Sequence, residues 1–78
     1  MDNLQKVEQI VRDVFDDSSI SVTKGTIIRE LPNWDSFTHI SLMAAIQDEF
    51  HTDFSIEEIS SIERIQEILE KIESYGKN

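Results

Sequence analysis

Cysteine is absent from the chain, which excludes a disulfide framework and any metal site built on thiolates. Glycine and proline are scarce too, at two and one in 78 residues, so the composition is not that of a low-complexity or disordered segment. No apolar run is long enough for a signal peptide or a membrane span. We therefore expect a globular, cytoplasmic protein that does not associate with a membrane.

Basic residues are also few. Seven lysines and arginines stand against 16 acids, a formal charge of −9, which would repel phosphate backbones and anionic lipids. We predict that the protein does not bind nucleic acid. The surplus acid suits a protein partner with a basic patch, or it serves only to keep a small protein soluble.

The short length limits the functions that the chain can have. We expect one domain, residues 1–78, that buries roughly 60% of its unfolded surface and has no deep cleft. His39 follows Ser36 by three residues, but the G-x-S-x-G context and a third triad member are missing. The acids do not form a calcium loop, and the histidines lack zincin spacing. We predict neither an enzyme nor a metal site.

Helical periodicity predicts three main helices. The first has its apolar residues at Leu4, Val7, Val11, Val14 and Phe15 and should end at residues 16–19. The second should begin at Asp35 or Ser36 and run to Phe50. The last has an apolar stripe at Ile62, Ile65, Ile68, Leu69 and Ile72 and should stop at Gly76.

Two capping boxes occur in the second half of the chain. Ser55-x-x-Glu58 predicts a short helix, and Ser60-x-x-Glu63 predicts the start of the last helix. The expected fold is therefore all-α, a small four-helix bundle of three main helices and a short third one. We expect its core to contain Val7, Val11, Val14, Leu42, Ile46, Phe50, Ile62, Ile65 and Leu69.

Residues 17–35 alternate like a strand near "ISVT", but no second strand is available to pair with them. We interpret them as a long loop. Its apolar residues should pin it to the core; they are Ile20, Val22, Ile27, Ile28 and Leu31. Loops of this length are uncommon unless they are functional.

The dipeptide Asp35-Ser36 stands at the start of the second helix. Asp before a helical run is most often only an N-cap, and the same dipeptide at Asp17-Ser18 follows a helix, so the pair alone carries little information. Its position carries more. If Asp35 caps the helix, the Ser36 hydroxyl lies in the first turn beside unpaired N–H groups, where a phosphate ester would be in a favourable field.

The stretch "WDSFTHISLMAAIQDEF" resembles the acyl carrier proteins, whose attachment site is Asp-Ser followed by a large apolar residue at the start of the second helix. The resemblance covers the whole chain, including the order of the helices, the long first loop and the acidic composition. It implies a carrier without enzymatic activity. It also implies that a phosphopantetheinyl transferase attaches 4′-phosphopantetheine to Ser36, with Asp35 holding the helix start.

The resemblance further implies partners that load and use an acyl thioester, and we expect a monomer. The second helix departs from fatty-acid carriers, because "SFTHIS" is uncharged and acids appear only at Asp48 and Glu49. The "LPNWDS" lead-in and the histidine are similar to those of stand-alone carriers of specialised biosynthetic pathways. Two alternatives stay open, a stand-alone peptidyl (aminoacyl) carrier and a helical interaction module without the arm.

Helical geometry, at about 100° per residue, predicts two apolar faces on the second helix. The core face should contain His39, Leu42, Met43, Ile46 and Phe50. The opposite face would dock partner enzymes through Phe37, Ile40, Ser41, Ala44 and Asp48. The alternative is that the preceding loop folds over Phe37 and makes it part of the core.

Overall fold

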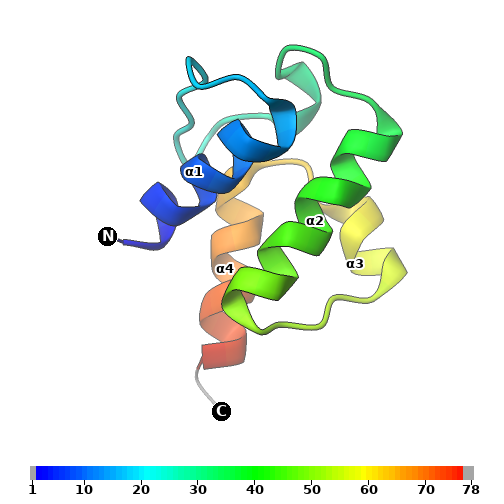
Figure 1. The fold of residues 1–78 in the computed structure, drawn as a ribbon. Coiled ribbons are helices and arrows are strands. Elements are labelled where there is room, and N and C mark those ends of the chain that lie inside the picture. The colour runs from blue at the N-terminus through cyan, green and yellow to red at the C-terminus, as the bar shows by residue number, and fades with distance from the viewer. Residues whose placement is uncertain (1, 77–78) are drawn as a thin grey trace.

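A computed structural model describes residues 2–76. Its elements, in chain order, are α1 (Asn3–Phe15), a 3₁₀ turn η1 (Ile28–Glu30), α2 (Ser36–Phe50), α3 (Ile56–Ser61) and α4 (Ile65–Gly76) (Figure 1). The described residues form no strand, and their one bridge joins Ile27 to Arg64. The all-α fold with a short third helix and a long first loop is confirmed.

Local caps explain the bounds of α1. The Asp2 carboxylate accepts a hydrogen bond from the Gln5 N–H (2.8 Å), and the Gln5 side chain accepts one from the Asp2 N–H (3.1 Å). The helix ends where Asp16 adopts a left-handed conformation with φ of 53°. The predicted end of the first helix is therefore confirmed.

The long loop is fixed to the rest of the fold by apolar side chains and by backbone hydrogen bonds. Ile20, Val22 and Ile28 are buried, whereas Ile27 and Leu31 are half-buried. The Ile28 N–H donates to the Glu63 carbonyl (2.9 Å), which ties the loop to the connection between α3 and α4. The loop is thus an ordered part of the structure, as its apolar residues predict.

The loop also starts α4, which corrects one prediction. The Ile65 N–H donates to the Thr26 carbonyl (3.1 Å), and the Gln66 N–H donates to the Lys24 carbonyl (2.9 Å). The box predicted at Ser60-x-x-Glu63 is wrong, because Ser60 lies within α3. The first N–H groups of α4 are satisfied by a segment distant in sequence, which a local capping pattern cannot reveal.

The other capping box is confirmed, since Ser55 and Glu58 exchange hydrogen bonds at the start of α3. Ile62 follows α3 as its C-terminal cap and is buried, although it precedes α4. The helix α4 extends to Gly76, the last described residue. Its predicted stop is at Gly76, and the residues after Gly76 lie outside those that the structure describes.

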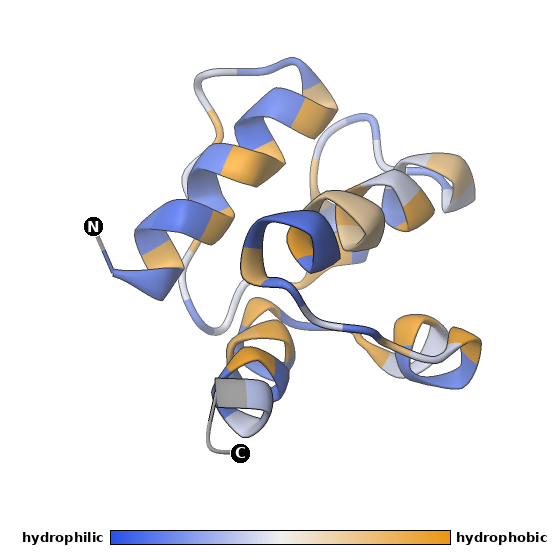
Figure 2. Cartoon of the chain, turned by 60° about the horizontal axis from the view of Figure 1, so that its bottom comes forward, coloured by the Kyte–Doolittle hydropathy of each residue, from blue (hydrophilic) through white to orange (hydrophobic). Residues whose placement is uncertain are grey.

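The core lies between the apolar sides of α1, α2 and α4, with the loop closing over it. Figure 2 shows that hydrophobic and hydrophilic residues alternate along α1 and α4, so that each helix has one apolar side. The fully buried side chains are Val7, Val11, Ile28, Leu42, Met43, Ile46, Ile62, Ile65 and Ile68. Two predicted core residues, Val14 and Phe50, are only partly buried. Phe50 lies near the end of α2, where the Lys6 ammonium is 5.9 Å from its ring centre.

This difference in burial predicts different costs of truncation. Leu42→Ala should lower the free energy of unfolding by about 2–5 kcal/mol, because Leu42 is fully buried and its removal leaves a cavity. Phe50→Ala should cost clearly less, since part of its ring already contacts solvent. Urea denaturation followed by circular dichroism measures both values. Equal losses in the two variants would contradict this description of the core.

Candidate functional site

The start of α2 is set by Asp35. Its backbone is extended, and its Oδ1 atom accepts hydrogen bonds from the N–H and the hydroxyl of Thr38, both at 2.7 Å. A carboxylate in this arrangement satisfies an N–H group that the helix leaves free. The predicted cap and helix start are confirmed, and Ser36 is the first residue of α2.

Ser36 is exposed and lies in this first turn. The positive end of the helix dipole and the free N–H groups of the turn favour an anion at this position. Ser18 has different surroundings, because Asp17 directs its carboxylate to the N–H of Ser19 (2.9 Å) in a turn after α1. The two Asp-Ser pairs therefore differ in structure as their positions predict.

A shallow groove of about 210 Å³ runs beside Ser36. Residues of α2 and α3 face each other across it, and the end of the long loop supplies the rest. The lining residues are Arg29, Trp34, Ser36, His39, Ile40, Ile59 and Ser60. An anchor at Ser36 would thus stand at the rim of a groove with both aromatic and polar groups.

His39 is the buried polar residue of this site. Its Nε2 atom is 3.0 Å from the Ile59 carbonyl oxygen, and its Nδ1 atom accepts a hydrogen bond from the Trp34 indole N–H (3.3 Å). Both ring nitrogens are therefore engaged, and neither is free to take a proton from Ser36. His39 lies on the core side of α2, as helical geometry predicts.

The opposite side of α2 carries two exposed apolar residues. Phe37 is 79% exposed and Ile40 is 60% exposed. Ala44 and Asp48 are exposed as well, and Ser41 is half-buried. The structure contradicts the alternative in which the loop covers Phe37, and the docking role of this face stays a prediction.

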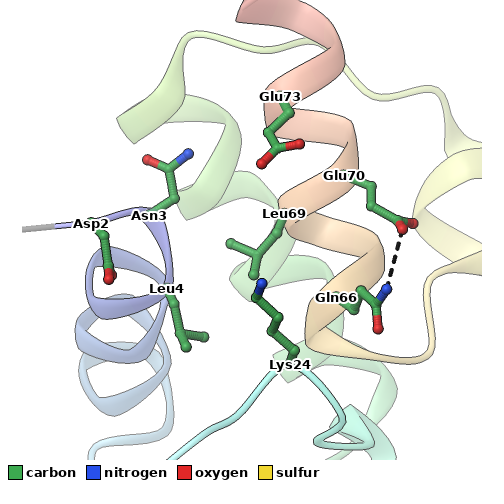
Figure 3. Close-up of a pocket in the computed structure, with 8 residues that line it drawn as sticks. All are labelled: Asp2, Asn3, Leu4, Lys24, Gln66, Leu69, Glu70 and Glu73. Atoms are coloured by element: carbon green, nitrogen blue, oxygen red, sulfur yellow. Dashed lines mark hydrogen bonds between the residues drawn. The ribbon is translucent and has the colours of Figure 1, made fainter.

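A second groove, of about 470 Å³, lies between the start of α1, the loop and α4 (Figure 3). Leu4 and Leu69 contribute its apolar part, and Asp2, Glu70 and Glu73 supply carboxylates around it. It shares no lining residue with the groove at Ser36. Within residues 2–76, no three His, Asp or Glu side chains are grouped so that they could hold a metal ion.

Sequence reasoning missed the partners of His39. Trp34 and Ile59 lie five and twenty residues from it, and Arg29 is held with its guanidinium carbon 6.0 Å from the centre of the Trp34 ring. The sequence did contain one sign that such partners exist. Helical geometry places His39 on the core side of α2, and a buried imidazole needs hydrogen-bond partners. The identity of those partners depends on how α3 packs, which the local pattern does not contain.

Comparison with known proteins reveals the fold family. No protein-family model and no curated protein matches the chain. Among solved structures, the chain is similar to the solution NMR structure of a holo acyl carrier protein from Geobacter metallireducens, with a TM-score of 0.82 and 26% sequence identity. The match covers 95% of this chain and 85% of that one. The chain has the fold of an acyl carrier protein. No helix within the described part of the chain has the length and apolar character needed to cross a membrane.

The cap predicts a pH dependence. The hydrogen bonds from the Thr38 N–H and hydroxyl lower the pKa of Asp35 below its ordinary value. A lowered folded-state pKa stabilises the fold above the unfolded pKa of about 3.9, and this contribution is lost as the pH falls through the folded pKa. Thr38→Val removes one of the two donors, so the Asp35 pKa should rise part of the way to its ordinary value.

Carboxyl ¹³C NMR during an acid titration measures this change. Asp17 serves as the control, because its pKa is lowered by Ser19 and should not change in the Thr38→Val protein. An unchanged Asp35 midpoint in the variant would show that the Thr38 hydroxyl does not stabilise the charged cap.

Proposed function

We propose that the protein is a carrier that holds an acyl group as a thioester on a 4′-phosphopantetheine arm attached to Ser36. The observation that carries this proposal is the exposed Ser36 at the first position of α2, in a chain with the fold of a holo acyl carrier protein. The protein itself catalyses no reaction. It presents its cargo to enzymes that act on it.

Attachment requires a hydroxyl that an enzyme can reach. A phosphopantetheinyl transferase would use coenzyme A, and the Ser36 oxygen would lose its proton and form a phosphodiester as the nucleotide leaves. Exposure of Ser36 admits the transferase, and the engaged nitrogens of His39 mean that the base must come from the enzyme. Asp35 contributes by holding the turn in place.

The surroundings of Ser36 fit the arm. The phosphodiester carries one negative charge, which the N-terminal turn of α2 stabilises through its dipole and free N–H groups. Arg29 lines the same groove and adds a positive charge to it. The arm supplies a thiol for the thioester, so a chain without cysteine can take part in thiol chemistry.

The surface for partner enzymes is the outer face of α2. Phe37 and Ile40 form its apolar part next to Ser36, and Ser41, Ala44 and Asp48 continue it along the helix. Exposed apolar side chains that lie together on a small protein favour contact with another protein. The transferase and the enzymes that load or use the cargo would share this face.

The distribution of charge favours a specialised biosynthetic pathway. The first two turns of α2 contain no acid, whereas α4 carries Glu67, Glu70 and Glu73. Docking on α2 should therefore depend more on contact area than on electrostatic steering. A stand-alone peptidyl carrier would use the same anchor and surface for an aminoacyl group, and the loading enzyme distinguishes the two.

Intact-mass measurement tests the anchor. After incubation with coenzyme A and a promiscuous phosphopantetheinyl transferase, the wild-type chain should gain the mass of one arm, and Ser36→Ala should gain none. The Ser36→Ala protein should keep its stability, because Asp35 still caps α2. Ser18→Ala, at the second Asp-Ser pair in the turn after α1, is the control and should be modified normally. An arm on the Ser36→Ala protein would refute the assignment.

Kinetics with a partner enzyme test the docking face. Phe37→Ala and Ile40→Ala should each raise the KM for the carrier, because they remove apolar area from the contact. Ile56→Ala is the matched control, since Ile56 is 77% exposed but belongs to α3. Circular dichroism confirms the fold of each variant.

Salt dependence separates this face from an acidic one. Raising the ionic strength should weaken binding only modestly, because few charges lie on the outer face of α2. The opposite result is that both α2 variants keep full activity while moderate salt abolishes binding. That result would place the docking surface on the acidic later helices instead.

A further inference from the structure

The helix α3 is less buried than the other helices of the described chain. It has six residues and none of them is buried, although Phe54 before it and Ile62 after it are. A helix of this length has little stability of its own, so its position depends on contacts with its neighbours. Ile59 packs partly against the core. The polar contacts of α3 therefore have a large share in placing it.

Among residues 2–76, two polar side-chain contacts join α3 to the other helices. The Lys71 ammonium of α4 lies 2.9 Å from the Glu58 carboxylate, but both side chains are about a third exposed, and such ion pairs contribute little. The second contact, between His39 Nε2 of α2 and the Ile59 carbonyl, is partly buried. Because water reaches it only in part, its loss leaves a polar group with a poorer partner.

The Ile59 carbonyl needs this donor. It is one of the last four carbonyls of α3, which have no partner within the helix. In a continued helix the Glu63 N–H would fill that role, but here it donates to the Glu67 carboxylate (3.2 Å). The Ile59 carbonyl therefore accepts its hydrogen bond from His39, because the Glu63 N–H is bonded to Glu67.

Trp34 fixes the state of the imidazole. An indole N–H can only donate, so the Nδ1 atom of His39 must accept and the ring proton must be on Nε2, where it donates to Ile59. The Trp34 and His39 rings also contact edge to face, with centres 5.8 Å apart. The series Trp34, His39, Ile59 therefore joins the end of the loop, α2 and α3 with a consistent donor at each step.

We propose that His39 is a positioning residue, which holds α3 against the start of α2 and so sets the shape of the groove that a phosphopantetheinyl transferase meets beside Ser36. The groove has Ser36, His39 and Ile40 on its α2 side and Ile59 and Ser60 on its α3 side. Release of the Ile59 carbonyl would separate the two sides. This role rests on the proposed function, because it is a role in presenting Ser36.

Amide hydrogen exchange tests the contact without reference to the arm. In the unmodified protein, His39→Leu should speed exchange at the Ile59 and Ile62 amides, which report α3, about fivefold to tenfold relative to amides of α1. His39→Gln, whose amide retains a donor, should recover part of the protection. His51→Asn is the control, because His51 is exposed at a left-handed position that asparagine tolerates.

Transferase kinetics test the positioning role. His39→Leu should raise the KM for the carrier several-fold and leave kcat unchanged, because Ser36 and its cap are intact, and His39→Gln should restore part of the KM. Trp34→Phe keeps an aromatic ring but removes the indole donor, so it should also speed amide exchange in α3 and raise the KM. This variant tests the proposal if His39→Leu does not fold.

Three results would overturn the proposal or its premise. Unchanged exchange at Ile59 and Ile62 in His39→Leu and Trp34→Phe would show that His39 does not hold α3. Faster amide exchange in these variants with an unchanged KM would show that transferase binding does not depend on the position of α3. A wild-type chain that accepts no arm would refute the proposed function and this role with it, while the exchange data would still decide whether the bond holds the helix.

Discussion

The two hydrogen bonds that the Asp35 carboxylate accepts from Thr38 fix the first turn of α2, and the functional geometry depends on that turn. With the helix starting at Ser36, the periodicity of 3.6 residues directs His39 into the protein and leaves Phe37 and Ile40 in solvent. A helix that began one residue later would leave Ser36 in the loop, away from the N-terminal turn that favours a phosphate ester.

The core is too small to cover both apolar faces of α2. The bundle can cover only one side of this helix, so Leu42, Met43 and Ile46 are buried while Phe37 and Ile40 are not. Exposed apolar side chains do not stabilise a monomer, and their place next to Ser36 is explained if another protein covers them. Glu67, Glu70 and Glu73 lie on α4, whereas the first two turns of α2 contain no acid.

Much of the fold could be predicted because it follows from local rules. Periodicity and capping residues give the bounds of α1 and α2, and the box at Ser55 gives the start of α3. The start of α4 could not be predicted, since the carbonyls of Lys24 and Thr26 provide its caps across some forty residues of sequence. The bond from His39 to Ile59 could not be predicted either, because its partners are twenty residues apart in the sequence. At the candidate site, position and exposure of Ser36 and Phe37 were predictable, but the groove between α2 and α3 was not.

The central claim is that position in the fold, and not the Asp-Ser dipeptide, makes Ser36 an attachment site. The chain contains the dipeptide twice, once at the start of α2 and once in the turn after α1. Peptide mapping by mass spectrometry, on the wild-type chain after incubation with coenzyme A and a phosphopantetheinyl transferase, compares the two directly. We predict the arm on the peptide that contains Ser36 and none on the peptide that contains Ser18. An arm on Ser18, or on neither serine, would contradict the claim.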